Sequence, residues 1–124
     1  MTPAPVKLPP IYRGCVWPAV ILDWEDQNGN PIDLSNFLPY AQMVNGVTLN
    51  AVKSQTTVGR TAIYMLEDQT ATLKLGRYNW DWVWKQISPE LKWPPFLSGE
   101  IEVLEPKTHV QSLNGAEPIF PDLP

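Results

Sequence analysis

The chain has few of the residues on which catalytic and metal sites depend. Its 124 residues include one cysteine, Cys15, and one histidine, His109. A single cysteine excludes an intrachain disulfide. Because Cys15 lies in an apolar run, we expect a buried, unreactive thiol. One histidine in a proline-bounded tail does not support a Ser-His-Asp triad or a histidine-based metal site. We therefore expect no enzyme activity, no cofactor and no metal.

Long apolar runs and clustered basic residues are also missing. No run of about 18 apolar residues is present, so we expect no transmembrane helix. The first five residues lack the basic region and apolar segment of a signal peptide. The nine lysines and arginines are scattered along a chain of net charge −4, which argues against a nucleic-acid partner. These features predict a soluble protein made in a cytoplasm, without a membrane partner.

The composition is that of one globular domain. Apolar residues make up 44% of the chain and charged residues 18%. A chain of this length can bury a core without disulfides or metals to hold it together.

Prolines are plentiful, and they gather at both ends of the chain. Eight of the 14 are Pro3, Pro5, Pro9, Pro10, Pro106, Pro118, Pro121 and Pro124. Proline-rich ends favour extended conformations with few internal hydrogen bonds. We therefore predict an N-terminal arm over 1–10, a folded domain over 11–105 and a C-terminal arm over 106–124.

The most distinctive stretch of the sequence is the run 77–86. Every second position carries a large aromatic side chain: Tyr78, Trp80, Trp82 and Trp84. Successive side chains of a strand point to opposite faces, so this spacing predicts a half-buried β-strand with the aromatic side chains on one face.

Further strands are predicted along the whole chain. Strand-length apolar or alternating runs cover 15–24, 37–44, 47–52, 61–66 and 97–105. The first run is apolar on both faces at its centre, as in a sandwich core, and Pro18 requires an edge, a bulge or a change of sheet there. Asn45-Gly46 predicts a tight turn. Together these elements predict an all-β fold, an antiparallel Ig-like β-sandwich of about six to eight strands.

The Asp26-x-Asn28-x-Asn30 spacing matches the first three ligand positions of a calcium loop. Pro31 follows where such a loop needs glycine. The residues are those of a turn, because Asn and Asp side chains bond their own backbone. We interpret this stretch as a turn.

The tryptophans are the strongest functional signal, and three interpretations of them remain open. The six are Trp17, Trp24, Trp80, Trp82, Trp84 and Trp93. They could form a platform for sugar rings, the core of a sandwich, or an interface between subunits. A wholly exposed row of aromatic side chains would promote aggregation, which favours core or interface.

Several parts of the sequence, taken in order, resemble a known domain type. The first is Tyr12-Arg13-Gly14 followed by Trp17, and the second is the Asp-x-Asn-Gly-Asn-Pro-Ile-Asp-Leu turn at 26–34. Further matching positions are Thr70, Leu73, Gly76, Tyr78, Trp80, Asp81, Gly99, Ile101 and Val103. Over about residues 11–105 this pattern resembles the small β-sandwich domains of tailed-phage virion proteins, such as the N-terminal domain of phage baseplate upper proteins.

The resemblance implies a structural, non-enzymatic virion protein of the tail or baseplate, or an adaptor or collar component. Its partners would be other virion proteins and further copies in a symmetric homo-oligomer, and its location would be the virion after synthesis in the host cytoplasm. Residues expected at partner interfaces are Pro3, Pro5, Pro9, Pro10, Trp82, Trp84, Trp93, Pro118, Phe120 and Pro121. The alternative is a carbohydrate-binding module that uses exposed tryptophans for host adhesion.

Overall fold

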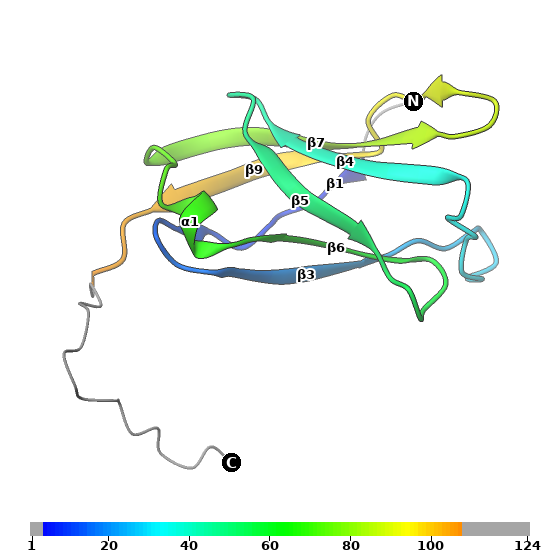
Figure 1. Ribbon diagram of the computed structural model, residues 1–124, viewed down its shortest axis with the longest axis horizontal. Coiled ribbons are helices and arrows are strands. Elements are labelled where there is room, and N and C mark those ends of the chain that lie inside the picture. Colours follow the sequence, from blue (N-terminus) through cyan, green and yellow to red (C-terminus); the bar gives the residue numbers. More distant parts are fainter. Residues whose placement is uncertain (1–3, 108–124) are drawn as a thin grey trace, which may run out of the picture.

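The computed structural model describes residues 4–107, which are nearly all β (Figure 1). Its elements are β1 (Ala4–Pro5), β2 (Ile11–Tyr12), β3 (Trp17–Asp23), β4 (Phe37–Met43), β5 (Thr48–Lys53), β6 (Arg60–Met65), α1 (Glu67–Thr70), β7 (Gly76–Gln86), β8 (Leu91–Lys92) and β9 (Leu97–Leu104). The predicted all-β class is confirmed. No helix in this range is long and apolar enough to cross a membrane.

The strands form one sheet that curls into a half-barrel, in the order β1-β9-β7-β4-β5-β6-β3. The curl depends on β5, which changes partner along its length. Its first two residues, Thr48 and Leu49, pair with β4, while Asn50–Lys53 pair with β6. The β9-β7-β4 part therefore faces the β6-β3 part across the interior (Figure 1).

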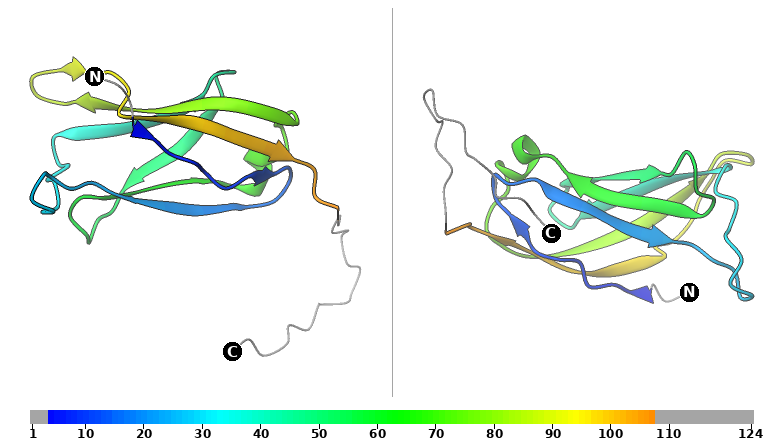
Figure 2. Two further views of the ribbon diagram at one scale, coloured as in Figure 1. Left: turned by 180° about the vertical axis from the view of Figure 1, so that it is seen from behind. Right: turned by 90° about the horizontal axis from the view of Figure 1, so that it is seen from below.

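The sheet is mixed, because β1 and β2 both pair with β9 in parallel. The chain between these two strands follows β9 along the side facing β3 (Figure 2). The N–H of Ala4 donates to the carbonyl of Phe96 at 2.9 Å, and that of Val6 donates to Ser98 at 2.9 Å. Leu8 is 4% exposed and Ile11 is fully covered. From Ala4 onward, this proline-rich segment is thus fastened to the chain's own sheet.

The strand β3 is an edge strand with an irregular register, which are two of the three alternatives that Pro18 predicts. Its register with β6 shifts between Trp17 and Val20, so the missing proline N–H falls at an irregularity of the ladder. The expected burial of both faces is wrong. Val20 and Leu22 are partly covered, but the intervening Ile21 is 52% exposed.

The expectation of a buried Cys15 is also wrong, because this thiol is exposed. The N–H of Cys15 donates to the carbonyl of Tyr12 at 3.0 Å, in a turn where Gly14 has a φ of 79°. This turn places Cys15 outside the sheet, two residues before β3 begins.

The aromatic strand is confirmed as β7, which is paired along both edges. Its neighbours are β4 and β9. Trp80, Trp82 and Trp84 are 2%, 0% and 4% exposed, while the intervening side chains face outward. The predicted strands at 37–44, 47–52, 61–66 and 97–105 correspond to β4, β5, β6 and β9.

The core contains apolar side chains from both layers, and it also contains polar indole groups. The indole N–H groups of Trp17, Trp80 and Trp82 are buried without a hydrogen-bond partner among the described residues. Near one end of the core, the covered hydroxyl of Thr70 donates to the carbonyl of Cys15 at 2.7 Å. This bond joins α1 to the turn before β3.

Candidate functional site

An apolar pocket lies at the end of the sheet where β4 begins and β7 ends. Its volume is about 260 Å³, and its walls are aromatic and aliphatic side chains: Trp24, Ile32, Leu34, Phe37, Trp84, Trp93 and Phe96. We call this the aromatic pocket. The rings of Trp24 and Trp84 meet edge to face, with centroids 5.1 Å apart and planes at 69°.

Trp24 reaches the pocket because a glycine lets two chain segments approach closely. The N–H of Trp24 donates to the carbonyl of Gly59 at 2.7 Å, and the Trp24 carbonyl accepts from Ile32 at 3.0 Å. A Cβ at Gly59 would lie 2.8 Å from the Trp24 carbonyl oxygen, and its φ is +78°. Only glycine fits this crossing without strain.

The opposite wall depends on Asn36, which the sequence analysis did not identify. Its side chain donates to the carbonyl of Ser88 at 2.9 Å and accepts from the Ser88 N–H at 3.1 Å. The β7–β8 hairpin is thereby fastened beside the start of β4. Trp93, just after the hairpin, is held by a bond from its N–H to the Trp84 carbonyl at 3.1 Å. The only sequence signal for Asn36 is its position directly before a strand.

Two of the three indole donors at the pocket are already used. Trp24 Nε1 donates to Thr61 Oγ1 at 2.9 Å, and Trp93 Nε1 donates to Gln86 Oε1 at 3.0 Å. A sugar in this pocket would leave hydroxyl groups without partners there, which is costly. The pocket is therefore suited to an apolar group.

The tryptophans do not form a flat exposed platform. Among the six, only Trp93 is exposed, at 40%. The rings of Trp82 and Trp84 are inclined at 72° to each other. The coplanar, exposed pair that sugar stacking requires is not found in them.

Two residues expected to face a partner, Trp82 and Trp84, are core residues of their own chain. Trp82 packs against Trp24 with ring centroids 5.5 Å apart. Trp84, although covered, also forms part of the wall of the aromatic pocket. Pro5, Pro9 and Pro10 are exposed along the N-terminal segment, while Pro3, Pro118, Phe120 and Pro121 lie outside the described residues. His109 also lies outside them.

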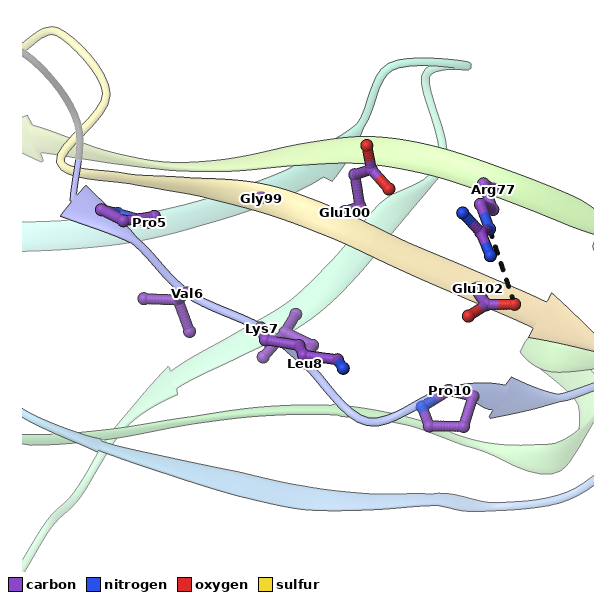
Figure 3. A pocket seen from close by; sticks show the side chains of 9 residues that line it. All are labelled: Pro5, Val6, Lys7, Leu8, Pro10, Arg77, Gly99, Glu100 and Glu102. Carbon is purple, nitrogen blue, oxygen red and sulfur yellow. Dashed lines mark ion pairs between the residues drawn. The ribbon is translucent and has the colours of Figure 1, made fainter.

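A second hollow, of about 540 Å³, lies between the N-terminal segment and the outer face of β9 (Figure 3). Four charged side chains line it: Lys7, Arg77, Glu100 and Glu102. The closest charged pair there is Arg77 Nε with Glu102 Oε2, at 3.8 Å. The hollow is thus lined by two charges of each sign.

The predicted turn at 26–30 is confirmed. The carboxylate of Asp26 accepts the backbone N–H groups of Asn28 and Asn30 at 2.8 and 3.0 Å. Gly29 has a φ of 81°. Across residues 4–107, no three His, Cys, Asp or Glu side chains are grouped to hold a metal.

Two exposed carboxylates have lowered pKa values with clear causes. The Ser35 backbone N–H, which donates to Asp33 at 2.9 Å, lowers the pKa of Asp33. The Arg60 guanidinium donates to Asp23 at 2.8 and 3.2 Å and lowers the pKa of Asp23. Both sets of hydrogen bonds stabilise the ionised carboxylate, because they are made to its charged form.

Comparison with known proteins finds no family model and no curated protein that matches this chain.

Many of the residues that carry the resemblance to phage domains serve the fold. Buried members of that pattern are Trp17, Thr70, Leu73, Trp80, Ile101 and Val103. Tyr78 is half-buried, and its hydroxyl donates to the Lys74 carbonyl at 2.7 Å. The pattern therefore consists largely of packing and turn positions.

Proposed function

We propose that this chain is a structural, non-enzymatic phage virion protein of the tail or baseplate, or an adaptor or collar component. It would act by assembling with further copies and with other virion proteins. The observation that carries the proposal is the clustering of exposed apolar side chains around the aromatic pocket. Ile32 and Trp93, which line the pocket, are 36% and 40% exposed, and Leu91, in β8 beside the end of β7, is 47% exposed. Clustered apolar exposure is typical of interaction surfaces.

We further infer an Ig-like relationship for the curled sheet. If β1 and β2 count as one strand and β8 as part of a hairpin, four pairings match that arrangement: β3–β6, β6–β5, β4–β7 and β7–β9. The Tyr78 hydroxyl, near the start of β7, bonds back to the backbone four residues earlier, as in a tyrosine corner. Two pairings depart from the arrangement, β4 with β5 and the N-terminal strands with β9.

The test is the mass of the full-length chain in solution, by sedimentation velocity over a range of concentrations. We expect an assembly of several copies. Replacing Leu91 and Trp93 together by serine should weaken it, because this removes apolar surface from the cluster. The matched control replaces Ile21 and Val52, which are 52% and 41% exposed on other strands, and should assemble normally.

A monomeric wild type that also fails to bind other virion proteins would contradict the proposal. So would unchanged assembly of the Leu91 and Trp93 double variant. Quenching of tryptophan fluorescence by polysaccharides, with no assembly, would instead support the carbohydrate-binding alternative.

A further inference from the structure

We propose that the aromatic pocket receives the segment Pro118-Ile119-Phe120-Pro121 of a second copy of this chain, with the Phe120 ring as the inserted group. This inference rests on the proposed function and names the contact through which copies would join. The segment lies outside the described residues, and its chemistry is known from the sequence.

The pocket accommodates one or two side chains. At about 260 Å³, it is smaller than the range of roughly 300–1,000 Å³ typical of sites for drug-sized ligands. Its walls are apolar, and the indole N–H groups of Trp24 and Trp93 are bonded to Thr61 and Gln86. An aromatic side chain can meet such walls edge to face, as the wall rings already meet each other.

The C-terminal residues contain one segment with the matching chemistry. Between residues 108 and 124, Phe120 is the only Phe, Tyr or Trp, and a proline lies two positions before it and another directly after it. Proline-bounded segments favour an extended conformation, so they lose little entropy on binding, and aromatic-lined grooves commonly recognise them.

The geometry favours a second copy over the chain's own tail. Phe96, in the pocket wall, directly precedes β9, and the described chain ends beyond the other end of that strand. The eight residues of β9 span about 26 Å at about 3.3 Å per residue. The thirteen residues 108–120 reach at most about 43–47 Å when fully extended, but a flexible chain of that length has an average end-to-end distance of only about 20 Å. The chain's own tail would therefore have to stay more extended than an average flexible chain to return along β9, and both edges of β9 are already paired.

The experiment uses two full-length variants that damage opposite halves of the contact. Phe120→Ala removes the inserted ring and keeps the pocket. Ile32→Glu places a charge in the pocket wall, at a side chain that is already 36% exposed, and keeps the tail. The controls are Leu113→Ala in the tail and Ile21→Glu on β3. Circular dichroism checks the fold of each variant.

We expect each of the two variants alone to self-associate at least about tenfold more weakly than the wild type, by sedimentation velocity. This corresponds to the loss of one modest contact. The controls should match the wild type. Mixing Phe120→Ala with Ile32→Glu should restore association, because one partner supplies an intact pocket and the other an intact tail. Such mixtures should stop at two copies.

Wild-type assembly that persists in Phe120→Ala, or a mixture that fails to associate, would overturn this inference and leave the proposed function intact. A wild type that neither self-associates nor binds other virion proteins would overturn both. A monomeric wild type whose tryptophan fluorescence changes in Phe120→Ala at every concentration would show that the tail folds back on its own pocket, and would also overturn it.

Discussion

Gly99 lies where the N-terminal segment crosses β9. A Cβ at this position would overlap with the carbonyl oxygen of Val6, and it would lie 3.1 Å from Trp80 Nε1. Because Gly99 has no side chain, the Val6 backbone and the Trp80 indole can both pack closely against β9 at this position. No positive φ is involved, so the requirement is one of space.

We expect Gly99→Ala to destabilise the protein by about 1–3 kcal/mol, because the added methyl group must displace a backbone segment or a buried ring. Urea denaturation monitored by tryptophan fluorescence measures this. Ser98→Ala, on the neighbouring position, should change the free energy of unfolding by no more than about 0.5 kcal/mol. Equal stability of Gly99→Ala and the wild type would show that the N-terminal segment does not pack closely against β9 at Gly99.

Asp23 and Arg60 join the ends of β3 and β6, and their ion pair predicts a dependence of stability on pH. Arg60 lowers the pKa of Asp23. In the folded protein this carboxylate stays ionised at pH values where the unfolded chain takes up a proton. The pair thus adds stability above about pH 4, and this is lost as the pH falls through the lowered pKa.

We expect Asp23→Asn to be slightly less stable than the wild type at pH 7 and to equal it in acid, since the wild type alone loses the ion pair. Urea midpoints measured between about pH 2 and 7 test this. Glu100→Gln, an exposed position on β9, is the control. A constant difference between Asp23→Asn and the wild type across this range would argue against the ion pair.

At the scale of elements, β7 organises the core. It is paired on both edges, and its buried face carries Trp80, Trp82 and Trp84. The indole N–H of Trp82 is buried without a partner among the described residues. An unpaired buried donor is unfavourable, so the contribution of Trp82 to stability comes from its ring and not from its nitrogen.

This difference predicts two unequal substitutions. Trp82→Ala should cost about 3–5 kcal/mol, as expected for removal of a buried aromatic side chain. Trp82→Phe should cost much less, because it keeps a ring and removes the unpaired donor. Thermal unfolding by calorimetry compares the two. Equal losses would mean that the nitrogen has a partner after all.

The sequence predicts elements well where local rules decide. The two-residue period of 77–86 identified the strand and its aromatic face, and Pro18 limited β3 to an edge, a bulge or a change of sheet. The same reasoning failed for Cys15, because an apolar run does not reveal that a turn precedes the strand. It also missed Asn36 at the aromatic pocket, whose role depends on Ser88, 52 residues away.

At the scale of the whole molecule, two features could not be predicted from local patterns. One is the curl of the sheet, which arises because the six residues of β5 pair first with β4 and then with β6. The other is the path of the N-terminal segment. Its prolines predict an extended arm outside the folded domain, but Leu8 is buried in the core and the backbone bonds to β9. Both features rest on contacts between residues far apart in the chain.

We expect Leu8→Ala to destabilise the protein by about 2–5 kcal/mol, as for other buried leucines. The loss should appear mainly as faster unfolding, if the N-terminal segment joins the sheet after the rate-limiting step. Stopped-flow fluorescence measures both rates. Lys7→Ala, an exposed neighbour, is the control. A slower folding rate for Leu8→Ala, with unfolding unchanged, would place this segment in the folding nucleus instead.

The parallel pairing of Ala4 with Leu97 and of Ile11 with Val103 also determines the order of events during synthesis. The first of these residues leave the ribosome about ninety positions ahead of the strand that they must join. Until β9 has been made, this segment lacks the strand with which it pairs. Because pairings between distant residues form slowly, the sheet is completed only when residues 4–12 meet a strand about ninety positions later in the chain.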